Sequence, residues 1–197
     1  MLKIKVKILI VFCLLLFNSN VQAKNPSTLI VEIVDQASSI LSSNLTDDEK
    51  INKLNEIAEN NVDIKGIGFY TLGKFRKNIS SEEQDRYADL FRKYFLKSFS
   101  SRLSQYSDPK INVVSHNTIN EKYTIVSSIL VETSERPEIK IDWRVYTINP
   151  TKPLIRDLII EGLSLARTQK EEFNSVIQGA DGDVNALFTN LENFTLK

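Results

Sequence analysis

Four segments of the sequence, INVVSH (111–116), YTIVSSILVE (123–132), IKIDWRVYTI (139–148) and LIRDLIIEGLSL (154–165), decide the fold class of this 197-residue chain. They are rich in β-branched and aromatic residues, and short turn-forming stretches separate them, so we predict an antiparallel sheet of about four strands. Ile139, Ile141 and Trp143 recur at every second position and would share one face of that sheet. The segments before residue 107 and after residue 166 show helical patterns, which predicts an α+β fold.

Two helix starts are marked by capping boxes, TDDE at 46–49 and SSEE at 80–83. The second box opens the longest expected helix, which would end near residue 106. Apolar residues at helical spacing predict another helix over 26–43, and two amphipathic patterns predict helices over 168–178 and 181–194. The stretch 62–75 is typical of a short helix that three glycines weaken.

The longest expected helix carries more apolar surface than a helix on the outside of a protein needs. At ~100° per residue, eight of its nine large apolar side chains fall within an arc of roughly 220°. A surface helix needs a stripe of only about 100° or slightly more. This helix is therefore either a central core helix or one that lines a ligand cavity as well as the core. On the second interpretation, Phe91, Phe95 and Phe99 would contribute to the cavity wall.

The first 23 residues predict a cleaved secretory signal peptide. Lys3, Lys5 and Lys7 precede a ten-residue apolar run at 8–17, and the small residue Ala23 ends a polar stretch. Cleavage there would leave residues 24–197 as one exported domain, located in the periplasm. The single cysteine, Cys13, lies inside the apolar run, so the mature chain would lack disulfides and thiolate chemistry.

The expected charge of the mature chain does not favour nucleic-acid binding. Removing the three lysines of the signal peptide leaves 22 basic residues against 25 acidic ones, a net charge of about −3. No basic run interleaved with aromatic residues occurs in the sequence. We therefore expect no nucleic-acid partner.

One short motif offers a candidate for catalysis. Gly162-Leu-Ser164-Leu-Ala166 resembles a nucleophile elbow, but its last position is not glycine. An activated serine needs a base within hydrogen-bond reach, and the only histidine, His116, lies upstream in a strand pattern. A serine esterase that uses Ser164 stays open as the weaker alternative, and we expect a protein that is not an enzyme.

Two other motifs are weaker candidates for ligand sites. Residues 181–192 imitate a calcium loop, but Ala186 stands where the sharp turn requires glycine, and the apolar spacing there favours a capped helix. Gly66-Ile67-Gly68 lacks the third glycine and the preceding strand of a dinucleotide motif. We therefore expect no metal site and no cofactor.

Several of these stretches together resemble the MlaC-type (toluene-tolerance) family of periplasmic phospholipid-binding proteins. The most specific is Asp157-x-x-x-Glu161-Gly162-x-Ser164, and residues 72–76 (LGKFR) and 81–84 (SEEQ) add to it. The resemblance spans about residues 27–192. The last strand of family members usually begins with a tryptophan a few residues before the aspartate, whereas Lys152-Pro153-Leu154 occupies that stretch in this chain.

The resemblance implies helices wrapped on a strongly curved sheet that enclose an apolar cavity for acyl chains. It also implies a carrier of phospholipid between an outer-membrane lipoprotein complex and an inner-membrane ABC lipid transporter. By position, the resemblance places Ile139, Ile141, Trp143 and Leu163 at the lipid. A different lipid such as a hopanoid, or an interaction protein with a closed core, remains open as an alternative.

Overall fold

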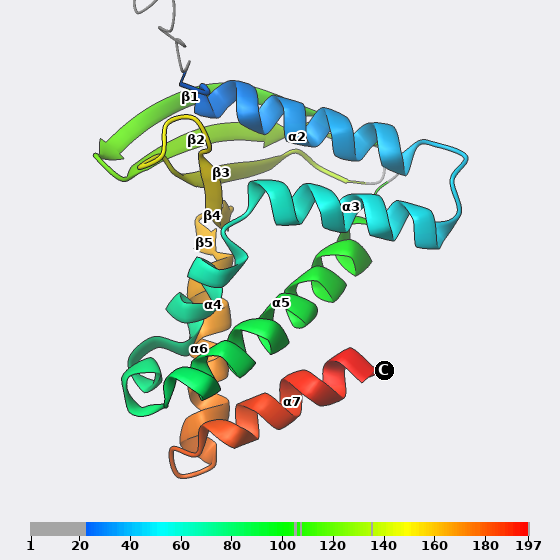
Figure 1. Ribbon diagram of the computed structural model, residues 1–197. Helices are drawn as coiled ribbons and strands as arrows, with labels where there is room; N and C mark the ends of the chain where they lie inside the picture. Colours follow the sequence, from blue (N-terminus) through cyan, green and yellow to red (C-terminus); the bar gives the residue numbers. More distant parts are fainter. Residues whose placement is uncertain (1–22, 105, 107, 135, 197) are drawn as a thin grey trace, which may run out of the picture.

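The four apolar segments form one antiparallel sheet in the computed structural model, which describes residues 23–104, 106, 108–134 and 136–196 (Figure 1). The strands follow one another across the sheet in chain order, so each pairs with its neighbours in sequence. They are β1 (Ile111–Asn120), β2 (Tyr123–Leu130), β3 (Ile139–Tyr146), β4 (Leu154–Ile160) and the two-residue β5 (Leu163–Ser164). The predicted α+β class is therefore confirmed.

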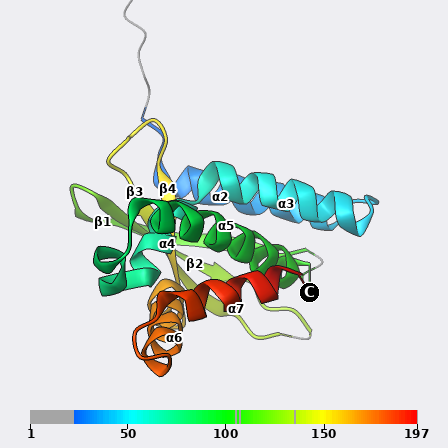
Figure 2. The same cartoon turned by 60° about the horizontal axis from the view of Figure 1, so that its bottom comes forward.

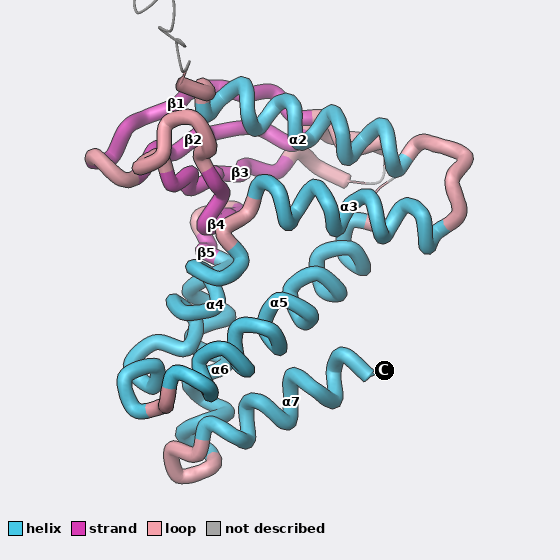
Figure 3. The backbone as a smooth tube through the Cα atoms, viewed as in Figure 1, coloured by secondary structure: helices cyan, strands magenta, loops and turns pink. Residues whose placement is uncertain are grey.

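Helix α2 (Pro26–Leu41) lies against the sheet, where it crosses β1 and β2, with α3 (Asp47–Asn61) beside it, whereas the later helices extend away from the sheet (Figures 1 and 3). These later helices are α4 (Ile64–Leu72), the 3₁₀ helix η1 (Gly73–Asn78), α5 (Ser81–Leu103), α6 (Leu165–Gly179) and α7 (Val184–Leu196). Of these, α4 and α6 contact β4. Figure 2 shows α5 between the α2–α3 pair and the α6–α7 pair.

Both predicted capping boxes form. Thr46 N–H donates to Glu49 Oε2 (2.9 Å) at the start of α3, and Ser80 N–H donates to Glu83 Oε2 (2.8 Å) at the start of α5. These bonds satisfy backbone groups that the first helical turn leaves unpaired. The capping pattern alone therefore located the start of the longest helix correctly.

The last predicted strand is wrong in its second half. Glu161 and Gly162 adopt φ of 49° and 82°, so the chain reverses there into β5 instead of continuing as one strand to Leu165. Two successive residues with positive φ make the tight turn that joins antiparallel strands. Ser164 then caps α6, which begins at Leu165, three residues earlier than predicted.

Other boundaries also differ from the sequence-based expectation, and two of them have a clear cause in the backbone. Strand β1 continues to Asn120, beyond the expected end at His116, because its polar second half still pairs with β2. The C-terminal helix begins at Val184 rather than 181, since Asp181 and Gly182 both have positive φ. In each case backbone geometry, and not the apolar pattern, sets the boundary.

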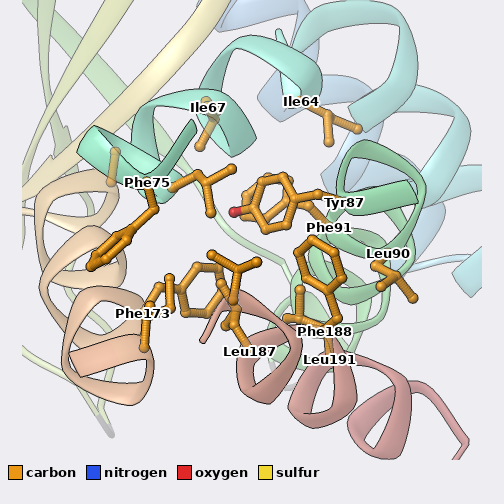
Figure 4. Packing of buried hydrophobic residues seen from close by; sticks show 14 of the residues in the cluster. Ile64, Ile67, Phe75, Tyr87, Leu90, Phe91, Phe173, Leu187, Phe188 and Leu191 are labelled. Atoms are coloured by element: carbon orange, nitrogen blue, oxygen red, sulfur yellow. The ribbon is translucent and has the colours of Figure 1, made fainter. Parts of the chain in front are cut away.

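Buried apolar side chains form two separate clusters. The first, the sheet core, joins α2 and α3 to the sheet through residues such as Ile30 and Val126. The second, the helical core, is built from α4 to α7 and contains Tyr87 and Phe91 at its centre (Figure 4). Helix α5 contributes to both clusters, because Phe99 packs against each of them. The wide apolar arc of α5 therefore reflects a helix that is covered on two sides.

The predicted signal peptide lies outside the described residues, except for its last residue, Ala23. Across the described ranges, the structure shows no helix with the length and apolarity that a bilayer crossing demands.

Candidate apolar binding site

One face of the sheet, which we call the inner face, carries apolar side chains from four strands. Strand register places Val126 of β2 opposite Trp143 of β3, and Trp143 opposite Leu158 of β4. Residues directly opposite each other project from the same side of a sheet. By the same register the inner face also includes Ile139, Ile141, Val145, Ile155, Ile160 and Leu163.

The apolar character of this face depends on a bulge in β4. The register between β3 and β4 shifts between Arg144 and Val145, so that Arg156 is the extra residue on β4. This irregularity allows Ile155 and Leu158 to project from the same face although they are three residues apart. A strict alternation would turn one of them outward.

Trp143 lies on the inner face, and its one polar side-chain atom already has a hydrogen-bond partner within the protein. The indole Nε1–H donates to Ser128 Oγ (2.8 Å), and Ser128 Oγ in turn donates to the Ile141 carbonyl (3.3 Å). Ser128 is fully buried, and it is a polar residue that sequence reasoning missed within an apolar strand. Because the hydrogen bond is internal, the ring can contact an apolar ligand without leaving a buried donor unpaired.

Helix α5 supplies aromatic residues beside this face. Phe95 and Phe99 stack with ring centroids 5.9 Å apart, and both are half-buried. Phe99, Leu103 and Tyr106 pack against the sheet core, in the same cluster as Ile141 and Leu158. The boundary between the two cores is therefore lined by apolar groups that protein atoms cover only in part.

The structure distributes the seven sequence-predicted site residues unevenly. Ile139, Ile141, Trp143 and Leu163 share the inner face, while Phe95 and Phe99 lie on the adjoining side of α5. Phe91 instead lies in the helical core, 2% exposed, where its ring packs against Tyr87, Phe173 and Gly68. Leu158, Ile160 and Leu103 join the site without having been predicted, although the alternation of β4 and the apolar arc of α5 carried the signal.

A buried carboxylate holds the corner where the sheet meets α6. Asp157, 4% exposed, accepts hydrogen bonds from Ser164 Oγ (2.6 Å), the Ala166 backbone N–H (3.0 Å) and Arg144 Nη1 (3.2 Å). The aspartate and serine of the Asp-x-x-x-Glu-Gly-x-Ser motif therefore act together across the β4–β5 turn. Their bonds fix the direction in which α6 leaves the sheet, and with it the position of Leu163.

Hydrogen bonds at the same corner occupy the side chain of Ser164. Its hydroxyl donates to Asp157 and accepts from Arg167 N–H (3.1 Å), which caps α6. The imidazole of His116 lies instead beside α2, with Nδ1 3.2 Å from Ser27 Oγ. Among the described residues, the two groups that an esterase would have to bring together thus have other partners, and Ser164 has a structural role.

The other two motifs also find structural explanations. Asp183 Oδ1 accepts from Asn185 N–H (2.9 Å) at the start of α7, whose Phe188 and Leu191 are buried in the helical core. Gly68 lies so close to Phe91 that an added Cβ would come within 2.8 Å of the ring. The glycine is therefore required by helix packing rather than by a nucleotide.

The chain is an α+β domain whose open antiparallel sheet carries an incompletely covered apolar face, and apolar surfaces of this kind are typical of small-molecule binding sites. The chain belongs to the MlaC protein family, whose model matches residues 27–193. A solved structure with the same fold is a phospholipid-binding protein from Ralstonia solanacearum in complex with a phospholipid. It is 18% identical, with a TM-score of 0.73 over 88% of this chain and 98% of the other.

Proposed function

We propose that this protein is a periplasmic phospholipid carrier that holds acyl chains between the inner face of the sheet and α5. The observation that carries the proposal is the set of partly exposed apolar side chains on the inner face and on the adjoining part of α5. They come from three strands and one helix: Ile139, Ile141, Leu158, Ile160, Leu163, Phe95, Phe99 and Leu103.

The comparisons support a lipid as the ligand. The MlaC family is one of lipid-binding carriers rather than of enzymes, and the Ralstonia protein of the same fold was solved with a phospholipid. The arrangement of hydrogen-bonded polar groups around the site also suits a carrier. Trp143 and Ser128 already have internal partners, so an acyl chain would meet apolar surface.

The energetics of acyl-chain burial explain why a carrier would depend on partner proteins. Each methylene removed from water contributes about 0.8 kcal/mol, so spontaneous release of a two-chain lipid into water would be very slow. Contact with a membrane complex would have to reshape the site or compete for the chains. We propose an outer-membrane lipoprotein complex and an inner-membrane ABC lipid transporter as these partners.

The ligand can be identified by mass spectrometry of lipid extracted from the purified protein. Leu163→Glu places a carboxylate on the inner face and is expected to reduce the bound phospholipid strongly, because burying a charge against acyl chains is costly. Leu163 is 60% exposed, so the variant should still fold. Val114→Glu is the matched control, since Val114 is 65% exposed on the edge strand β1 and lies outside the site.

Equal lipid content in both variants, or no lipid in the wild-type protein, would contradict the proposal. Recovery of a hopanoid or another polycyclic lipid in place of phospholipid would also contradict it, and would support the alternative carrier.

Export can be tested separately from binding. We propose that the signal peptide is removed after Ala23, shortly before Asn25 caps α2. Cell fractionation is expected to place the protein in the periplasm, and N-terminal sequencing is expected to begin at Lys24. Retention of the first 23 residues on a membrane-associated protein would refute this part of the proposal.

A further inference from the structure

A second site is suggested by an open depression of about 480 Å³ next to α4, which shares no lining residue with the inner face of the sheet. Two observations meet there: a concave surface, and an unusual concentration of positive charge around aromatic rings. The side chains that line it are Asp63, Lys65, Phe69, Tyr70, Arg76 and Arg156.

One of the cations in the depression is already neutralised. Arg156 binds Asp63 Oδ2 through Nε (2.6 Å) and Nη2 (2.5 Å), and its Nη1 donates to the Tyr123 hydroxyl oxygen (3.0 Å). Its guanidinium also stacks on the Tyr146 ring at 3.6 Å. The Arg156–Asp63 pair therefore has a structural role and its charges balance. The electrostatic potential of the depression is determined by the other cations.

Two further cations share one aromatic ring. The Arg76 guanidinium lies 4.1 Å from the centroid of Phe69, and Lys65 Nζ lies 5.6 Å from the same centroid. Both side chains are exposed. Within the described residues, the carboxylate paired with Lys65 is that of Asp85, whose Oδ1 lies 4.0 Å from Lys65 Nζ. Arg76 Nε donates to the neutral side chain of Gln84 (3.5 Å).

A fourth cation, outside the lining of the depression, extends this positive surface. Lys170 of α6 places Nζ 5.0 Å from the centroid of the exposed Tyr70 ring. Like charges held close together repel one another, and cation–π contacts offset only part of that cost. A bound anion would offset the rest, in a chain whose expected net charge is otherwise negative.

We propose that this depression binds a phosphate group. A phosphate has several terminal oxygens and can accept from a lysine and a planar guanidinium at once, whereas a carboxylate is satisfied by a single arginine fork. The group could belong to free inorganic phosphate or to a phospholipid headgroup at a membrane surface, and the two sources can be separated by experiment. Phosphate binding here does not depend on the carrier function.

The test compares the double variant Lys65→Gln/Arg76→Gln with Lys53→Gln/Lys122→Gln, which removes the same charge from exposed positions elsewhere. Inorganic phosphate is titrated by calorimetry at low salt, and phosphatidylglycerol vesicles are tested by co-sedimentation. Because both side chains are exposed, loss of their two charged contacts is expected to weaken binding about tenfold in the first variant, with little change in the second.

Binding of phosphate alone would assign the site to a soluble ion, and binding of vesicles alone would assign it to a headgroup. Either result supports the inference if Lys65→Gln/Arg76→Gln weakens that binding and Lys53→Gln/Lys122→Gln does not. The inference is overturned if neither probe binds, or if both double variants weaken binding equally. Co-purifying lipid measured in the same samples keeps this outcome separate from the carrier proposal, because neither variant touches the inner face.

Discussion

Replacing Asp157 by alanine should destabilise the protein more than any other single change at the corner between the sheet and α6. The carboxylate is 4% exposed and accepts three hydrogen bonds, from Ser164 Oγ, Ala166 N–H and Arg144 Nη1. Without it, a buried backbone N–H and a partly buried guanidinium would lose their acceptor together. Removing one member of a buried charged pair typically costs about 3–5 kcal/mol.

The geometry of the partners narrows the expected loss of stability in Asp157→Ala. Arg144 retains partial access to water, with 39% of its side chain exposed, so it recovers some solvation. The Ser164 hydroxyl can rotate toward other acceptors. We therefore expect a loss of about 3 kcal/mol in the free energy of unfolding, at the lower end of that range. Urea denaturation followed by far-ultraviolet circular dichroism measures it.

Two related variants make this prediction specific. Ser164→Ala removes one donor and the cap of α6, so it should cost only about 1–2 kcal/mol. Asp157→Asn keeps one acceptor oxygen but turns a donor toward other donors, and should lie close to Asp157→Ala. A loss below about 1 kcal/mol for Asp157→Ala, or a larger loss for Ser164→Ala, would refute the role assigned to this carboxylate.

Three other predictions follow from the packing of the helices. Gly68→Ala should lower the free energy of unfolding by about 1–3 kcal/mol, because the new Cβ would press on the buried Phe91 ring. In the control Gly179→Ala the new Cβ meets no atom within 4 Å, so this variant should be neutral or slightly stabilising. Thermal melts compare the two variants. Burial raises the pKa of Tyr87, so the unfolded state alone should ionise this group above pH ~10 and stability should fall as pH rises. That alkaline loss should be smaller in Tyr87→Phe, and an unchanged pH profile would contradict the assignment. Thr46→Ala should cost about 1 kcal/mol through loss of the α3 cap, as measured by urea denaturation; an unchanged midpoint would argue against the capping box.

The sequence was most informative where a local rule fixes local geometry. Capping boxes located the starts of α3 and α5, and alternation placed Ile139, Ile141 and Trp143 on one face of β3. The sequence was least informative where contacts between distant segments determine which way a side chain faces. A helical wheel can show that α5 is apolar over a wide arc, but it cannot tell that Phe91 faces the helical core while Phe99 reaches the sheet.

The errors at the end of the sheet have a common physical origin. The apolar pattern runs through residues 154–165, whereas two residues with positive φ, Glu161 and Gly162, reverse the chain. The extra residue Arg156 is likewise determined by pairing with β3 and not by its own neighbours in sequence. Neither Ser128 under Trp143 nor the depression beside Phe69 leaves a periodic trace in the sequence, because each joins residues from separate elements.

The proposed binding of acyl chains against the inner face can be tested most directly through Trp143, the only tryptophan of the chain. Delipidated protein would be mixed with phosphatidylcholine brominated along its acyl chains, and tryptophan emission would be recorded against unbrominated lipid. We expect strong quenching by the brominated lipid, reduced in Leu163→Glu and retained in Val114→Glu. Emission that is the same with both lipids, in a sample shown to bind them, would contradict a lipid site beside Trp143.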